Sequence, residues 1–180
     1  MVFSSAIFLF AFLPLTFIGS LLIRQRWAQN AFLTLASLIF YAFGEPVYVF
    51  LMIASAGVNY GFGRGIAAVR GKRMKRLLLV LAVICDLAVL GVFKYAGFAV
   101  TNVNALFGIA LPVPAIRLPV GISFFTFQAM SYVIDVYRNR DMCQKDFMKV
   151  LLYISFFPQL IAGPIVRWNE IGRASCRERV

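Results

Sequence analysis

Long apolar runs follow one another along this chain, and short clusters of lysine and arginine separate them. Hydrophobic residues make up 62% of the sequence, whereas soluble domains are typically about 45–50% apolar. The hydrocarbon core of a bilayer is about 30 Å thick, so a helix crosses it with about 20 apolar residues. The pattern therefore predicts an all-α fold, a polytopic bundle of transmembrane helices.

Six segments are long enough to cross, since a bilayer can thin around the shorter ones. They are residues 1–23, 27–44, 47–62, 77–93, 119–137 and 150–166. Pro158 and Pro164 interrupt the last segment, which is therefore expected to be broken or re-entrant. Residues 96–118 carry asparagines and prolines, so we expect a helix and loop at the outer surface there, in place of a seventh span.

The basic residues predict the orientation of these spans. Alternating crossings bring the loops 24–26, 64–76 and 138–149 to one side, where they hold twelve lysines and arginines, whereas the other side holds only Lys94 and Arg117. Basic loops are enriched on the cytoplasmic side of membranes. We therefore expect a multi-pass protein with its N-terminus outside, in which residues 1–23 form a retained span because no positive charge precedes Arg24.

The composition argues against several kinds of site. The chain contains no histidine, which is the commonest general base and metal ligand. Its three cysteines form no CxxC pair, so neither a disulfide framework nor a metal site is expected. The net charge of +11 lies in loops between apolar runs and not on one folded face. Membrane lipid, and not nucleic acid, is therefore the expected partner.

Two predicted spans carry polar side chains that lipid would not accommodate. Asp86 stands near the middle of residues 77–93, where a carboxylate costs about 2.5–3.5 kcal/mol. It either lines a substrate path or makes a structural hydrogen bond to another span, with Asn59 or Gln128 as candidate partners.

A second polar pattern lies in residues 119–137. Phe124, Gln128, Ser131 and Asp135 recur at spacings of three and four, which predicts one helical face. Such a face is expected to turn toward the protein interior, either to pack on a neighbouring helix or to line an acyl or substrate channel.

Several sequence stretches together resemble the membrane-bound O-acyltransferase family, and within it the alginate O-acetyltransferase-like subgroup. In chain order they are MVFSSAIFLFAFLP, FYAFGEPVYVFLM, ASAGVNYGFG, FKY, LPVGISFFTFQAMSYVIDVYR and FFPQLIAGPIVRW. The resemblance covers residues 1–168, which we take as the N-terminal transmembrane part of an acyltransferase domain. Residues 169–180 lie outside it and are expected to be a non-native tail.

The resemblance implies transfer of an acetyl group from a cytoplasmic donor, acetyl-CoA or an acyl carrier, to hydroxyls of a polysaccharide outside the bacterial inner membrane. Alginate is the first choice of acceptor, and peptidoglycan O-acylation or D-alanyl transfer are alternatives. The resemblance also implies other O-acetylation proteins as partners and no bound cofactor. Beside Phe124, Gln128 and Ser131, it suggests Gln159 and Arg167 as residues that line the substrate path.

The family carries its catalytic histidine in the second half of a longer chain. Because this sequence has no histidine, we assign no catalytic residue to it and expect no transfer activity from these 180 residues alone. A non-enzymatic membrane transporter is the alternative from another functional class, but one charged residue near mid-span and no inverted repeat are weak support for it.

Overall fold

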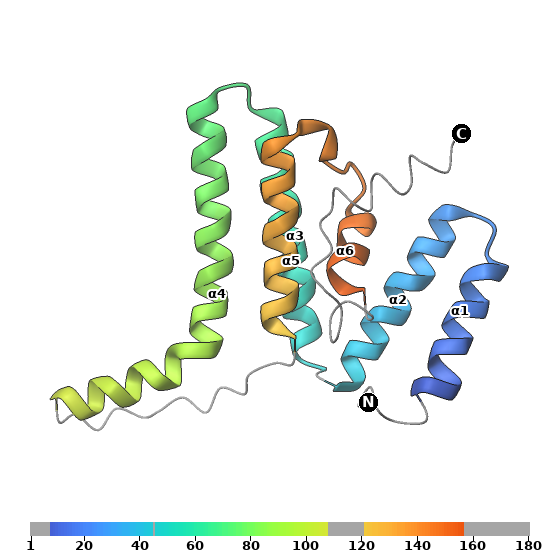
Figure 1. Ribbon diagram of the computed structural model, residues 1–180, viewed down its shortest axis with the longest axis horizontal. Helices are drawn as coiled ribbons and strands as arrows, with labels where there is room; N and C mark the ends of the chain where they lie inside the picture. Colours follow the sequence, from blue (N-terminus) through green and yellow to red (C-terminus); the bar gives the residue numbers. More distant parts are fainter. Residues whose placement is uncertain (1–7, 45, 108–120, 157–180) are drawn as a thin grey trace.

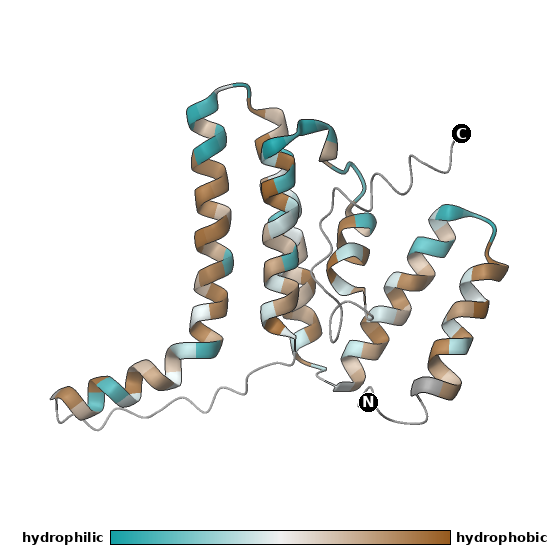
Figure 2. Ribbon diagram, viewed as in Figure 1, coloured by the Kyte–Doolittle hydropathy of each residue, from teal (hydrophilic) through white to brown (hydrophobic). Residues whose placement is uncertain are grey.

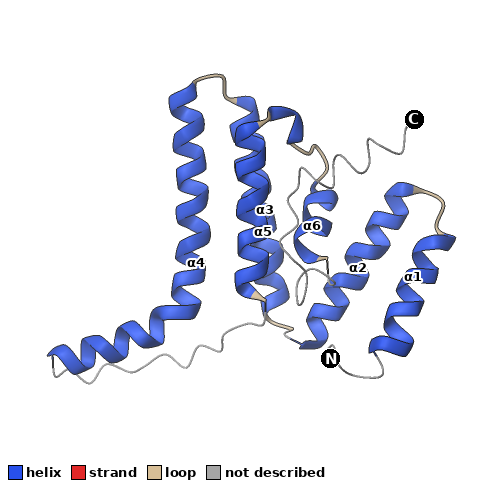
Figure 3. Cartoon of the chain, in the orientation of Figure 1, coloured by secondary structure: helices blue, strands red, loops and turns tan. Residues whose placement is uncertain are grey.

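The computed structural model describes residues 8–44, 46–107 and 121–156, and every regular element in these ranges is helical (Figure 3). A short π-helix, η1, spans Phe8–Phe12, and a 3-10 turn, η2, spans Arg140–Met142. The α-helices are α1 (Leu13–Leu22), α2 (Arg26–Gly44), α3 (Tyr48–Ala68), α4 (Lys72–Phe107), α5 (Ile122–Arg138) and α6 (Phe147–Ser155).

Each predicted span corresponds to one of these helices, but two boundaries differ substantially. Helix α3 extends to Ala68, past the predicted end at 62, although Gly63 and Gly65 are poor helix formers. Helix α4 continues to Phe107, so the outer-surface helix expected within residues 96–118 is a direct extension of the fourth predicted span. Residues 108–120 and 157–180, with the predicted loop, Gln159, Arg167 and the tail, lie outside the described ranges.

The centre of the molecule is formed by α3 and α5, which lie side by side (Figure 1). Helix α4 packs along both of them, and α6 packs against α3 and α2 on the other side. The core consists mainly of aliphatic and aromatic side chains from these helices, including Met52, Ile66, Phe125, Tyr132 and Ile154. Helix α1 contacts α2 at the edge of the bundle (Figure 1).

Local sequence accounts for several helix boundaries. Gly121 precedes α5 with φ of 83°, a left-handed conformation that glycine adopts without steric cost. The side chain of Asp146 accepts a hydrogen bond from the Met148 N–H and caps the start of α6. Pro14 stands in the first turn of α1, where its missing N–H is not needed.

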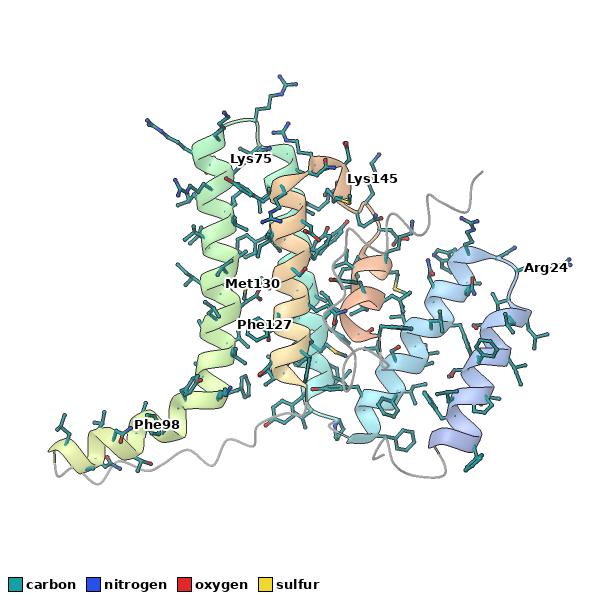
Figure 4. All side chains as sticks on the ribbon, in the orientation of Figure 1. Arg24, Lys75, Phe98, Phe127, Met130 and Lys145 are labelled. Atoms are coloured by element: carbon teal, nitrogen blue, oxygen red, sulfur yellow. The ribbon has the colours of Figure 1, made fainter. Side chains whose placement is uncertain are left out.

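The three basic connections lie at the same end of the molecule. Figure 2 shows hydrophilic residues at the α3–α4 and α5–α6 connections at the top and at the α1–α2 connection at the upper end of that helix pair, and Figure 4 labels Lys75, Lys145 and Arg24 at these places. Phe98 lies at the opposite end (Figure 4). This grouping is what alternating crossings require, and the placement of the basic loops on one side of a membrane stays a prediction.

One described helix, residues Lys72–Leu106, is long and apolar enough by itself to cross a membrane, and Phe10–Leu22 is a shorter apolar helix. Large apolar side chains are exposed along several helices, among them Phe17, Leu22, Phe43, Phe50 and Ile84. This exposure is unfavourable in water and is expected of a surface that faces lipid. The helical bundle is thus confirmed, whereas six crossings remain a prediction.

Candidate functional site

Polar side chains buried among apolar helices are the chemically distinctive feature of this molecule. Thr16, Thr34 and Ser37 each donate to a carbonyl within their own helix, which is how hydroxyl groups are ordinarily accommodated in apolar surroundings. The other buried polar residues lie on α3 to α6, and we call them the polar core set: Asn59, Asp86, Thr126, Gln128 and Ser155. The name denotes the set and not a single cavity.

Asn59 of α3 and Asp86 of α4 form a hydrogen-bonded pair between two helices. Asn59 Nδ2 lies 2.8 Å from Asp86 Oδ1 and 3.0 Å from the Ser55 carbonyl oxygen, so both amide hydrogens are used. The side chain of Asn59 is fully buried and Asp86 is 4% exposed. The predicted structural hydrogen bond between Asp86 and Asn59 is therefore confirmed.

Gln128 of α5 connects to the end of α6. Its Nε2 donates to the Tyr153 carbonyl oxygen at 2.7 Å, and the side chain is buried. Helix α6 ends at Ser155, and the last carbonyls of an α-helix have no partner within the helix itself. Gln128 donates to one of these carbonyls and therefore stabilises the last turn of α6.

Four side-chain oxygens of the polar core set have no hydrogen-bond partner within the described ranges. They are Asn59 Oδ1, Asp86 Oδ2, Thr126 Oγ1 and Ser155 Oγ. A buried polar atom without a partner costs about 1–3 kcal/mol, and in native proteins such atoms gather where a partner group or a ligand belongs. These oxygens are the polar groups that the described helices can offer to a water molecule, a substrate or a further part of the protein.

The predicted face of α5 is only partly buried. Gln128 is 4% exposed, whereas Phe124 is 41% exposed and Ser131 is half-buried. The buried face of α5 is centred instead on Phe125, Ala129, Tyr132 and Val136, together with Ile122, Thr126 and Val133. Gln128 stands at one edge of this face, and Phe124 and Ser131 lie just beyond that edge. The assignment of these three residues to a substrate path stays a prediction.

Sequence reasoning did not single out Tyr132, which the structure places at a tight contact between α3 and α5. Its ring lies against Gly63 and is fully buried. The Tyr132 hydroxyl accepts a 3.4 Å hydrogen bond from the Gln144 N–H, and Cys143 Sγ lies 3.7 Å from the Gly63 carbonyl oxygen. The glycines of YGFGRG, which predict close helix packing, were the signal that could have located this contact.

The basic end contains an open recess between α4 and α5. Its volume is about 530 Å³, and it is lined by Lys72, Arg73, Arg76, Leu79, Val80 and Tyr137. Nearby, the Arg140 guanidinium donates to the Val69 carbonyl oxygen and connects η2 to the α3–α4 turn. Among the described residues, no group of three histidine, cysteine or acidic side chains is placed to hold a metal ion. Because Lys72, Arg73 and Arg76 line the recess, this end of the molecule is suited to attracting anionic groups.

Comparison with known proteins reveals close relatives over nearly the whole chain. It is 41% identical to the probable alginate O-acetylase of Azotobacter vinelandii over 95% of this chain and 35% of that protein. The probable alginate O-acetylase of Pseudomonas aeruginosa is 40% identical over 95% of this chain and 34% of its own length. The peptidoglycan O-acetyltransferase of Helicobacter pylori is 34% identical over 95% of this chain and 38% of its own length.

No family model matches the chain, and no solved structure matches it. The chain spans about a third of the length of the curated relatives it matches. The identities of 34–41% nevertheless extend over 95% of this chain. The resemblance seen in the sequence is thereby confirmed: over nearly its whole length the chain is similar to about a third of alginate O-acetylases and of a peptidoglycan O-acetyltransferase, proteins of the membrane-bound O-acyltransferase type.

Proposed function

We propose that this chain forms part of a membrane O-acetyltransferase that moves an acetyl group from a cytoplasmic donor to hydroxyls of a polysaccharide on the other side of the membrane. The observation that carries the proposal is the 40–41% identity over 95% of the chain to proteins named as alginate O-acetylases. Every relative reported above is named for O-acetyl transfer, which favours this function over a transporter.

The arrangement of charge supports a donor on the basic side. Acetyl-CoA carries phosphate groups, and an acyl carrier protein is acidic, so either donor would be attracted to the recess lined by Lys72, Arg73 and Arg76. Since basic loops face the cytoplasm in most membrane proteins, the recess would face the compartment in which these donors are made. The polar core set would then lie between the donor side and the acceptor side.

Alginate is the acceptor that we propose first, because the relatives with the higher identities carry that name. Peptidoglycan is the second candidate, because the Helicobacter pylori relative is 34% identical over the same share of this chain. Both acceptors present sugar hydroxyls, so the chemistry at the acetyl carbonyl is the same: a base removes the hydroxyl proton as the oxygen attacks.

We assign the general base to a histidine outside this sequence, since the sequence contains none. The 180 residues alone are therefore expected to transfer no acetyl group. The test incubates the purified chain with polysaccharide and with a donor that carries a radiolabelled acetyl group. Transfer of the label to the polysaccharide would contradict this expectation.

The function itself is tested in the complete gene from which the chain derives. Deleting the gene should remove acetyl esters from the alginate of the producing cell, and restoring it should return them. Ester loss from peptidoglycan instead of alginate would support the second acceptor. Unchanged ester content in both polymers would contradict the proposed function.

A further inference from the structure

Helix α4 is much longer than a membrane crossing requires. Its 36 residues correspond to about 54 Å of helix at 1.5 Å per residue, whereas the hydrocarbon core is about 30 Å thick. Figure 1 shows how the excess is accommodated: the helix turns sharply, and its last part runs across the direction of the first. We call residues 94–107 the arm.

The arm begins where α4 stops contacting the bundle. Ala82, Asp86 and Leu90 are buried at intervals of four residues and form the stripe by which α4 packs on its neighbours. The stripe ends with Phe93, whose ring lies edge-on to Tyr48 at a centroid distance of 5.8 Å. Phe98 is already 69% exposed and lies on the arm, away from the other described helices (Figure 4).

The arm is amphipathic at helical spacing. Its polar or small residues Lys94, Gly97, Thr101 and Asn104 follow one another at intervals of three and four, and so share one face. The opposite face is mainly apolar and includes Tyr95, Ala96, Ala99, Val103 and Leu106, with Asn102 beside Tyr95. Phe98 and Val100 stand at the two boundaries, and Ala105 falls within the polar face.

The apolar face is left uncovered by the described helices. Tyr95 is 54% exposed and Leu106 is 79% exposed. The face continues a row of exposed apolar side chains that runs along the first part of α4 and includes Leu77, Leu81, Ile84 and Leu87. The candidate membrane helix Lys72–Leu106 includes both this row and the arm, so lipid that covers the row would also reach the arm.

We propose that the arm is an interfacial membrane anchor, which lies in the plane of the leaflet opposite the basic loops with its apolar face on the acyl chains. The span of α4 fixes the depth at which the arm begins, and the turn directs it along the membrane surface (Figure 1). Amphipathic helices bury such a face about 5–10 Å into the boundary between headgroups and acyl chains.

The residues at the turn match this depth. Lys94 Nζ lies 5.6 Å from the centroid of the Tyr95 ring. Tyrosine is enriched at membrane–water interfaces, and lysine extends its ammonium group toward the headgroups. A continued straight crossing would instead carry Lys94, Thr101 and two asparagines into hydrocarbon, which is costly.

The test is a spin-label depth measurement on the chain in bilayer nanodiscs of phosphatidylethanolamine and phosphatidylglycerol, with the native cysteines replaced by alanine. Labels at Val103→Cys and Leu106→Cys are compared with one at Thr101→Cys on the polar face. Ile84→Cys serves as the standard for a lipid-facing site, and Arg73→Cys as the standard for water. Collision with oxygen reports lipid, and collision with a water-soluble nickel chelate reports solvent.

The proposal expects the labels at Val103 and Leu106 to collide preferentially with oxygen. Their ratio of oxygen to nickel collision rates should be several-fold above that of the Thr101 label and below that of the Ile84 label. Equal and high nickel accessibility at all three arm positions would overturn it, because the arm would then project into water. Low accessibility to both reagents at Val103 and Leu106 would also overturn it, since protein would then cover the face.

A second measurement avoids the cysteine replacements. Val103→Trp and Thr101→Trp are introduced separately into the otherwise unchanged chain, and quenching by lipids brominated near the top of the acyl chain is measured against the unsubstituted chain. Greater quenching of the tryptophan at 103 than at 101 supports the anchor. Equal quenching at the two positions contradicts it.

Discussion

Gly63 of α3 lies directly against the ring of Tyr132 of α5, so closely that a Cβ built on the glycine would come within 2.8 Å of Tyr132 Cε1 and 3.0 Å of its hydroxyl oxygen. The two helices that form the centre of the bundle can approach each other here because position 63 has no side chain. Both residues are buried, and neither backbone nor ring has space to retreat without disturbing the core.

Gly63→Ala is therefore expected to destabilise the bundle by about 1–3 kcal/mol, the usual cost of forcing an extra methyl group into a packed interior. Gly61→Ala is the matched control on the same helix, because a Cβ there would meet nothing within 4 Å. The control should change stability by less than about 1 kcal/mol. Thermal unfolding in detergent micelles measures both, and equal effects would contradict the close packing of α3 on α5.

The Asn59–Asp86 hydrogen bond is expected to couple α3 to α4. Asn59→Ala, Asp86→Ala and the double variant form a double-mutant cycle, and the expected interaction energy is about 0.6 kcal/mol, the average for side-chain hydrogen bonds between membrane helices, and at most about 1.7 kcal/mol. Unfolding by a denaturing detergent gives the three stabilities. Strict additivity would mean that the pair contributes nothing to helix association.

Gln128→Leu is expected to destabilise the end of α6 by about 1–3 kcal/mol, because the Tyr153 carbonyl would lose a buried donor. Phe124→Leu, at an exposed position on the same helix, is the control and should change stability little. Protease resistance of the α6 region reports the local effect. In the complete protein, a loss of acetyl transfer with unchanged stability would instead support the predicted role of Gln128 in a substrate path.

The basic end is expected to face the cytoplasm. Alkaline phosphatase, which is active only outside the cytoplasm, would be fused after residue 44, after residue 70 or after residue 139. The fusion after residue 44 should be active and the other two inactive, because residues 70 and 139 lie within the basic connections at the opposite end of the bundle (Figure 2). The reverse pattern of activity would contradict the predicted orientation.

The helical content and the order of the helices could be predicted from the sequence, because apolar runs of this length have few structures available to them in a membrane. The grouping of the three basic connections at one end followed from the same alternation. The partner of Asp86 was among the candidates for a related reason: a carboxylate within an apolar span needs a polar group on another span, and few were available.

The tertiary structure decided what no single helix encodes. Spacing placed Phe124, Gln128 and Ser131 on one face of α5, but the arrangement of α3, α4 and α6 around α5 determined that only Gln128 is buried. The contact between Gly63 and Tyr132 and the hydrogen bond from Gln128 to α6 likewise arise between segments far apart in the chain. Periodicity reports which face of a helix is apolar, whereas burial depends on which neighbour packs against that face, and this relation is settled only when all the helices are assembled.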